Sequence, residues 1–562
     1  MLNFRSWSGT EGKALCSRIF IRGEEFRLDK NEKMIVCGDP SAEAWKEVPL
    51  PQAQVQLKIL LQNQGYFSPV FQIENGSLYV DRGPLTEIRH WTVMSEDPVV
   101  NPQKKRKVVD EALTSRKLDE VDKWIENELK SQGYACPRVS SGARVWENAI
   151  ESSYQTGSQL RIASVQREGL EEIDENALQR FEAYKLNQIY DSRKLRLTSN
   201  RLLSDGLAQS SAYTQNCTEA GVELTHHLSL GKPRIFRVGF GASSEELPFL
   251  DLWYKDTRLD RQASSYWLSM HISPLIQSFE ASSELYWIPI WKKIFVGPRF
   301  QFKREDEANY ETVHGDFGVD LGTLWDSDDY RFNLRAGPTV NTLKTVQGIG
   351  PEAANYLSAQ GSWQITSHDY ESNTAQQFVG SEGTFSYQGQ REGLGSPISA
   401  NQWSFVGKHL WNLMDFAPPL LIVASRLKTS FTDTMNEPEN LPPEYRVFLG
   451  GEQSLRGFQR QAIDNQGLGY LSAVYLGFEF RLIEELPWKL EPLLLWDGAR
   501  TGNEPWKLED PFFQSVGLGL RWASPLGPFR ITAARGEIFH GNEKTEAIPQ
   551  EWVYLFSFGN EF

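Results

Sequence analysis

The chain has 562 residues, 40% of them hydrophobic and 12% aromatic, and its 73 acidic residues against 58 lysines and arginines give a net charge of −15. This charge argues against a nucleic-acid partner, because neutralising phosphates requires a basic surface. No apolar run approaches the roughly 18 residues of a membrane-spanning helix, which excludes a helical membrane protein. A transmembrane β-barrel is not excluded, since every second residue of its strands faces water and its average hydropathy is low.

The first residues and the cysteines bear on the compartment. Residues 1–7 contain no cationic region followed by an apolar run, so we expect no signal peptide in this chain. The four cysteines, Cys16, Cys37, Cys136 and Cys217, are too few for a disulfide scaffold and include no CxxC pair for zinc. Cys16 and Cys37 would bridge within one small domain in an oxidising compartment, and the alternative is two buried thiols. We expect no metal and no cofactor.

The first 230 residues repeat one pattern. Apolar residues at helical spacing end twice in a similar phrase, at Leu61–Tyr66 and Leu129–Tyr134, and a weaker third copy lies at Leu203–Ala208. Such a repeat indicates a duplicated unit, and the glycine in each phrase suits the left-handed residue after a helix. We predict three α+β units of strand–helix–helix–strand–strand at residues 14–83, 84–158 and 159–231.

From residue 232 onward the hydrophobic period changes to two. In one segment Phe317, Val319 and Leu321 alternate with Asp316 and Asp320. An apolar face opposite a charged face suits a strand between lipid and a wet lumen. About sixteen such segments fit residues 232–562, and a closed antiparallel barrel leaves no unpaired edge in lipid. A soluble β-sandwich array or propeller is the alternative, but the repeated blade motif of a propeller is absent from the sequence.

One connection, residues 433–469, is too long for an ordinary barrel turn. It is rich in Pro and Gly and contains the sequence GGEQSLRGF at Gly450–Phe458. Loops of this length inside a compact fold are usually functional. Further motifs follow in order: GFEF at Gly477–Phe480, WDG at Trp496–Gly498, GLGLR at Gly517–Arg521 and SPLGPFR at Ser524–Arg530.

This ordered set resembles the BamA/TamA superfamily of outer-membrane assembly barrels. The resemblance implies three N-terminal POTRA domains followed by a barrel of about sixteen strands. It also implies that the loop at 433–469 folds into the lumen through its RGF motif, with Ser454, Leu455, Arg456, Gly457 and Phe458. Three POTRA-like units, together with the ending at residues 556–562, resemble the TamA type more than BamA or the two-partner secretion transporters.

Arg456 and two acidic residues form the first candidate site. A guanidinium confined in a lumen requires carboxylates to accept its planar donors. Glu479 and Asp497 lie on adjacent predicted strands, and the alternation around Glu479 points its side chain inward. We expect a charge-assisted cluster that holds the loop to the wall. The alternative is a solvated loop arginine beside ordinary lumenal acids.

The meeting point of the first and last strands is the second candidate site. In this superfamily the two strands form a weak seam that opens laterally, which implies roles for Val238 and Phe240 in the first strand. In the last strand Phe556 and Phe558 share one face, Gly559 weakens strand packing, and the terminal aromatic Phe562 resembles the insertion signal of outer-membrane barrels. The alternative is an ordinary lipid-facing strand.

The sequence predicts a non-enzymatic protein. It contains no Gly-x-Ser-x-Gly elbow, Walker A or His-Glu-x-x-His pattern. The resemblance implies a bacterial outer-membrane assembly or translocation factor with its POTRA domains in the periplasm. Its partners would be outer-membrane lipid, nascent client proteins and an inner-membrane-anchored, periplasm-spanning TamB-like protein. The alternatives are a general BamA-type insertase, a two-partner-secretion-type transporter, and a porin or surface enzyme on a similar barrel.

Overall fold

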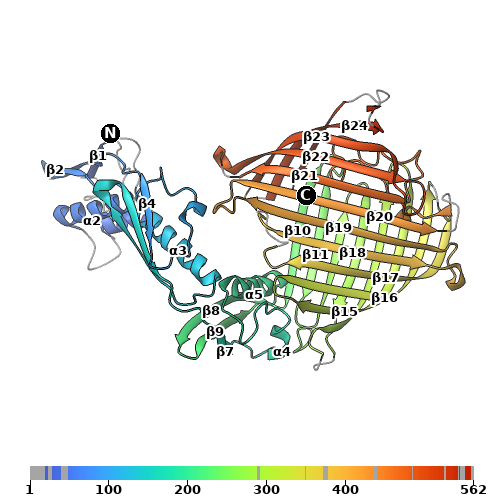
Figure 1. Cartoon of the computed structure of the whole chain (residues 1–562), viewed down its shortest axis with the longest axis horizontal. Helices are drawn as coiled ribbons and strands as arrows, with labels where there is room; N and C mark the ends of the chain where they lie inside the picture. Colours follow the sequence, from blue (N-terminus) through green and yellow to red (C-terminus); the bar gives the residue numbers. More distant parts are fainter. Residues whose placement is uncertain are drawn as a thin grey trace, which may run out of the picture. The chain divides into compact units, whose positions relative to one another are not determined.

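A computed structural model describes residues 19–22, 28, 30–38, 48–287, 291–348, 350–370, 377–434, 440–483, 485–524, 527–541, 543–544 and 551–558 (Figure 1). The chain divides into two compact units, residues 1–161 with 189–192 and residues 162–188 with 193–562. Across the described ranges, no helix has both the length and the apolar character to cross a membrane.

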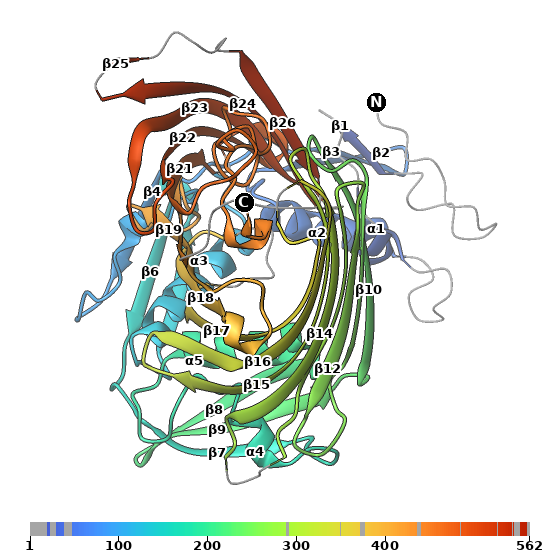
Figure 2. The same ribbon diagram turned by 90° about the vertical axis from the view of Figure 1, so that its right-hand side faces the viewer.

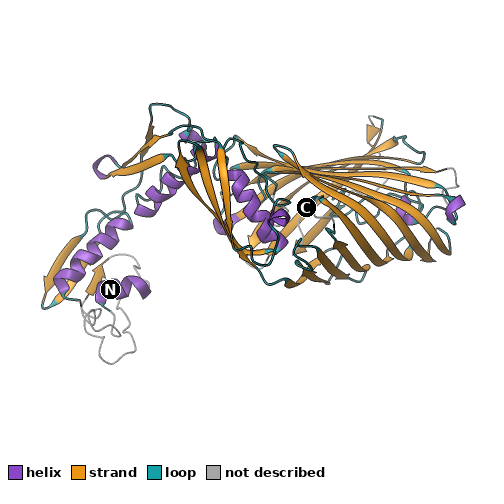
Figure 3. Cartoon of the chain, turned by 90° about the horizontal axis from the view of Figure 1, so that it is seen from below, coloured by secondary structure: helices purple, strands orange, loops and turns teal. Residues whose placement is uncertain are grey.

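Three small mixed sheets with helices build the N-terminal modules, which resemble POTRA domains (Figure 3). In each sheet the last strand lies in the middle, parallel to the first strand and antiparallel to the second. Module 1 contains β1 (Ile19–Arg22), α1 (Lys30–Cys37), α2 (Leu50–Asn63), β2 (Val70–Glu74) and β3 (Ser77–Asp81). Module 2 contains β4 (His90–Met94), η2 (Pro102–Lys104), α3 (Ser115–Ser131), β5 (Arg138–Arg144), η3 (Val145–Glu147) and β6 (Ala149–Gln155). Module 3 contains β7 (Ile162–Glu168), α4 (Glu175–Leu178), α5 (Ser192–Asp205), β8 (Ala208–Thr218) and β9 (Gly221–Leu230).

The repeated phrases end helices, as the sequence predicts. Gly65, Gly133 and Gly206 follow α2, α3 and α5 with φ of 96°, 101° and 82°. A side chain at such φ angles is strained, so glycine is the suitable residue. The predicted order of elements is present in modules 1 and 3, whereas the first helix of module 2 is only the short η2.

The remaining sheet closes into a barrel (Figure 2). Sixteen described strands form its antiparallel wall, as predicted, and the two-residue β25 pairs antiparallel with the end of β24. The strands are β10 (Arg234–Ser243), β11 (Phe249–Asp256), β12 (Ser265–Ile272), β13 (Ile276–Glu284), β14 (Ile294–Asp306), β15 (Glu311–Asp326), β16 (Tyr330–Gln347), β17 (Ala353–Ser367), β18 (Gly380–Gln390), β19 (Ala400–Leu413), β20 (Leu421–Thr434), β21 (Ser472–Leu482), β22 (Leu490–Gly502), β23 (Glu509–Ser524), β24 (Gly527–His540), β25 (Glu543–Lys544) and β26 (Trp552–Phe558).

The barrel wall is apolar outside and polar inside. On β15, Phe317 and Leu321 are exposed, whereas Asp316 and Asp320 are buried on the lumenal face. A soluble protein would reverse this arrangement, because charged groups lose their hydration on burial. The outward apolar face therefore fits a hydrocarbon environment.

Three sequence predictions need adjustment or fall outside the described chain. The long connection runs from residue 435 to 471, because β20 extends to Thr434 and β21 begins at Ser472. Cys37 is disulfide-bonded, as are Cys136 and Cys217, and Cys16 lies outside the described residues. Gly559 and Phe562 also lie outside the described residues.

Candidate functional site

The long connection between β20 and β21, called here the lumen loop (residues 440–471 as described), lies inside the barrel. Figure 2 shows this segment, coloured orange, within the ring of strands. Two short bridges stiffen it, Val447 with Tyr470 and Leu449 with Ile463. Its apolar residues pack with side chains of the wall, including Tyr475. The loop therefore forms a packed plug inside the barrel and is not a solvent-exposed loop.

Arg456 lies at the centre of this plug with 1% of its surface exposed. Its backbone N–H and its Nε donate to Oδ2 of Asp497 at 3.1 and 3.0 Å, and its Nη2 donates to Oδ1 at 2.6 Å. Its Nη1 donates to Glu479. Both carboxylates are fully buried on adjacent strands, β22 and β21. The structure thus places together the three residues that the sequence singles out.

Two further arginines share Glu479. Arg481, two residues along β21, donates through Nε to Glu479 Oε2 at 2.8 Å, and Arg530 on β24 donates to Oε1. Buried charges persist only when they are paired and hydrogen-bonded. Glu479 therefore connects the loop to β21 and β24 at the same time.

Sequence reasoning missed these two arginines, although a signal existed for each. Arg481 shares the inward face of Glu479 by the two-residue period of a strand. Arg530 is the last residue of the SPLGPFR motif, for which the sequence alone predicts no specific contact. Tyr475 was also missed, and its hydroxyl donates to Asp497 Oδ1 at 2.9 Å.

Gly457 brings the loop backbone against the wall. Its N–H donates to Ser515 Oγ on β23 at 3.0 Å. A Cβ at this position would lie 2.3 Å from the backbone nitrogen of Gly536 on β24. Phe458 packs edge-on against Phe513 with ring centroids 6.1 Å apart. In the RGF sequence, Arg456 thus supplies the charged hydrogen-bond donors, Gly457 allows the loop backbone to approach the wall closely, and Phe458 packs against an aromatic ring of the wall.

Ser454 and Leu455 complete the motif. Ser454 Oγ accepts from the backbone N–H of Gly450 at 2.9 Å and so closes the turn before Arg456. Leu455 is fully buried with Leu449 and Ile463. These contacts fix the backbone from which Arg456 extends.

The charge balance holds Arg456 in its ionised form. Burial alone would lower the pKa of its guanidinium, but the carboxylates of Glu479 and Asp497 outweigh burial and raise this pKa above its usual value. Truncating one member of such a cluster typically costs about 3–5 kcal/mol, because the remaining charge stays buried without compensation. The cluster is a structural lock for the loop. Among the described residues, no group of three or more His, Cys, Asp or Glu side chains is arranged to hold a metal ion.

The seam residues occupy the closing edge of the barrel. In the described strands, β10 and β26 pair only where Ala242 faces Phe558 and Ser243 faces Ser557. Phe240, which is 73% exposed, lies with its ring centroid 6.3 Å from that of Phe558. Phe556 accepts a hydrogen bond through its carbonyl from the N–H of Ser244 at 2.9 Å.

Val238 lies further along β10. It pairs with Leu252 of β11 and is exposed. No described residue of β26 faces it in the sheet.

Three solved structures are similar in outline at low identity. BamA from Haemophilus ducreyi lacking POTRA domains 1–3 matches at 14% identity and a TM-score of 0.48, over 84% of this chain and 99% of that chain. CdiB from Acinetobacter baumannii matches at 14% identity and a TM-score of 0.46, over 84% and 90%. CdiB from Escherichia coli matches at 13% identity and a TM-score of 0.45, over 90% and 95%.

A family model gives the decisive match. The model described as the Omp85 superfamily domain matches residues 230–562, which is more than half of the chain and includes all barrel strands and the lumen loop. This match confirms the superfamily expected from the ordered motifs. It supports an outer-membrane location and a role in outer-membrane assembly or secretion. The chain belongs to the Omp85 superfamily.

Proposed function

We propose that the chain is an outer-membrane translocation and assembly factor of the TamA type, which helps client proteins insert or pass through a lateral opening between β10 and β26. The pairing of these two strands, which the described residues make at two positions only, carries this proposal. By contrast, β24 pairs with β26 along its whole described length, from Trp552 to Phe558. Among the pairings of the described residues, the β10–β26 boundary has the fewest paired positions in the wall, so its separation breaks the fewest of these backbone hydrogen bonds.

A client strand would form backbone hydrogen bonds with the edge of β10. Residues Arg234 to Gly241 pair with β11 on one side. An unpaired strand edge is a template for another chain, because each added residue satisfies backbone donors and acceptors. In lipid this gain is large, since an unsatisfied backbone group has no water to replace its partner. Strand pairing thus supplies the driving force, and the chain assists assembly without catalysing a covalent reaction.

The N-terminal modules would act in the periplasm as docking sites. In module 1 the edge strand β2 exposes Val70 and Ile73, which suits addition of an extended partner segment. We propose a TamB-like periplasm-spanning protein and nascent clients as these partners. Replacing Val70 with Lys in the full chain should reduce co-purification of a TamB-like partner. Replacing Gln72, another exposed residue of the same strand, with Lys tests whether added charge alone has this effect.

A reversible lock across the seam tests the function. Ser243→Cys with Ser557→Cys places two cysteines opposite each other in the register of β10 and β26. In lipid vesicles, the oxidised protein should fail to assemble an unfolded barrel client, and a reductant should restore assembly. The matched control is Phe317→Cys with Val340→Cys, an opposed pair on β15 and β16. Undiminished assembly by the oxidised seam variant would reject lateral opening.

The same assay separates the alternatives. A general BamA-type insertase would assemble varied clients at an equal rate whether or not a TamB-like protein is added. A two-partner-secretion-type transporter would release its client into the vesicle lumen or medium instead of leaving it in the membrane. The TamA type predicts membrane-inserted clients and a rate that rises with the TamB-like protein.

A further inference from the structure

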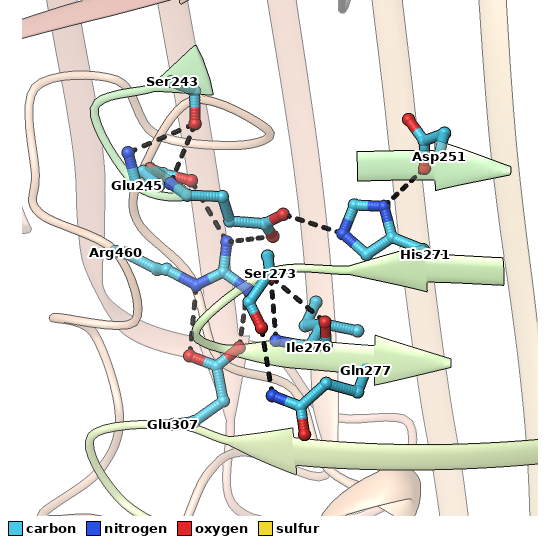
Figure 4. Close-up of polar contacts among 10 residues, drawn as sticks. Ser243, Glu245, Asp251, His271, Ser273, Ile276, Gln277, Glu307 and Arg460 are labelled. Carbon is cyan, nitrogen blue, oxygen red and sulfur yellow. Dashed lines mark hydrogen bonds and ion pairs between the residues drawn. The ribbon is translucent and has the colours of Figure 1, made fainter. Parts of the chain in front are cut away.

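The lumen loop also contacts the opposite edge of the barrel sheet, four residues after Arg456. Arg460 lies among carboxylates from the β10–β11 turn and the β14–β15 turn (Figure 4). Its Nε and Nη2 donate to the two oxygens of Glu307 at 3.1 and 2.6 Å. Its Nη1 donates to Glu245 at 3.2 Å and lies 3.6 Å from Glu246. This fork engages a carboxylate with both arms, the strongest geometry for such pairs.

The turn after β10 is built to present its two glutamates. Ser243 Oγ accepts from the backbone N–H groups of Glu245 and Glu246 at 3.2 and 2.9 Å. His271 on β12 lies with Nε2 3.1 Å from Glu246 and Nδ1 2.7 Å from Asp251 on β11. Figure 4 shows this chain of contacts leading from Arg460 to β11 and β12. These hydrogen bonds therefore hold the carboxylates of Glu245 and Glu246 against the first strands of the barrel.

The loop makes a second contact with the same turn. The backbone N–H of Glu452 donates to Glu245 Oε1 at 2.6 Å. Close packing accompanies this bond, because a Cβ on Gly451 would lie 2.1 Å from the same oxygen. Residues 451–460 therefore touch the first hairpin at both ends of the segment.

The two anchors lie on opposite sides of the seam. Arg456 and Gly457 bind β21, β22 and β23, which lead to the last strand. Arg460 binds the turns of the first strands. Between these two edges, direct pairing of described strands is limited to Ala242 with Phe558 and Ser243 with Ser557. The loop adds ionic bonds across a boundary at which the described residues pair at two positions.

We propose that Arg460 makes the lumen loop a strap across the β10–β26 seam, so that the seam opens only when Arg460 leaves Glu245, Glu246 and Glu307. This inference rests on the proposed lateral opening. Without Arg460 the three carboxylates would face one another, and like charges at short range repel. The first hairpin would then swing away from the loop while Arg456 keeps the loop on the last strands.

Spin labels across the seam test the strap. Labels on cysteines introduced at the exposed positions Val238 and Tyr554 report the distance between β10 and β26 in the full chain in lipid nanodiscs. We expect Arg460→Gln to add a population at longer distance, and Arg460→Lys to add a smaller one. The matched control is Arg299→Gln, which removes a lumenal arginine bound to Thr339 and Gln360 on other strands.

The outcomes separate the strap from the proposed function. An Arg460→Gln distance distribution equal to that of the parent overturns the strap, as does equal lengthening in Arg299→Gln. If Arg460→Gln does not fold, Glu307→Gln replaces it, and an unchanged distance there overturns the strap as well. The measurement needs no client. A seam that lengthens in a chain that assembles no client supports the strap and rejects the assembly function.

Discussion

Asp497 holds Arg456 by its backbone and its side chain together. Oδ2 accepts from the backbone N–H at 3.1 Å and from Nε at 3.0 Å, while Oδ1 accepts from Nη2 at 2.6 Å. One carboxylate on β22 thus fixes both the position of the loop and the direction of the guanidinium.

Arg456→Ala should release the lumen loop. The variant leaves Glu479 and Asp497 buried with less compensation, which we expect to cost about 3–5 kcal/mol of stability. Hydrogen exchange of residues 449–463 in the full chain should become faster. Arg299→Ala provides the control, because Arg299 pairs with Asp320 on β15 at 3.3 Å and lies outside the lock. Unchanged exchange of the loop in Arg456→Ala would contradict the lock.

Gly457→Ala should displace the loop without removing any charge. Its Cβ would lie 2.3 Å from the nitrogen of Gly536 and 2.4 Å from the backbone carbon of Arg535. Overpacking of this kind typically costs about 1–3 kcal/mol. We expect a lower temperature at which the folded form is lost in heated SDS gels. Gly315→Ala on β15 has room for the added carbon, with its nearest contact at 3.9 Å, and should leave that temperature close to the parent value.

Module 3 should lose stability in mild acid through His226. Burial, and to a smaller extent the positive charge of Arg167, lowers the pKa of His226 to about 4. The unfolded chain therefore binds a proton more readily than the folded one, and stability falls as pH drops from about 6.5 towards 4. With a folded pKa of about 4 and an unfolded pKa of about 6.5, we expect a loss of about 2 kcal/mol between pH 7 and pH 5. Hydrogen exchange of β8 and β9, corrected for its intrinsic pH dependence, measures this loss.

The matched variants are His226→Gln and His227→Gln. His226 is buried against Tyr213, with ring centroids 4.2 Å apart, and bonds Ser211 at 2.8 Å. His227 points to the other face, where it meets Glu168 at 2.8 Å. Only His226→Gln should abolish the pH dependence. Persistence of the full dependence in that variant would assign the effect to another group.

Arg180→Ala should loosen module 3 from the turn between β11 and β12. The Arg180 guanidinium lies 3.6 Å above the ring of Tyr286, and its Nη2 donates to the carbonyl of Gln262 at 2.6 Å. Protease cleavage within residues 257–264 should become faster. Arg261→Ala serves as control, since its pair with Asp174 is exposed and such pairs contribute only about 0–1 kcal/mol. Equal cleavage in both variants would contradict a specific role for Arg180.

The sequence determined the local features of this protein because each depends on short-range periodicity. Alternation of Phe317 and Leu321 with Asp316 and Asp320 predicts a strand between lipid and lumen, and the wall has that arrangement. The glycine after α2 and α3 predicts helix ends with positive φ, which Gly65 and Gly133 adopt. The ordered motifs identify the superfamily, which the match over residues 230–562 confirms.

Only the tertiary structure decided how the lumenal charges are shared. Arg530 reaches Glu479 from 51 residues away, and Arg460 reaches Glu307 and Glu245 across 153 and 215 residues. Strand periodicity shows that a side chain faces the lumen, but it does not show which strand lies opposite. Barrel closure and the path of the loop set these pairs, because a buried arginine is stable only where the folded chain brings carboxylates to it.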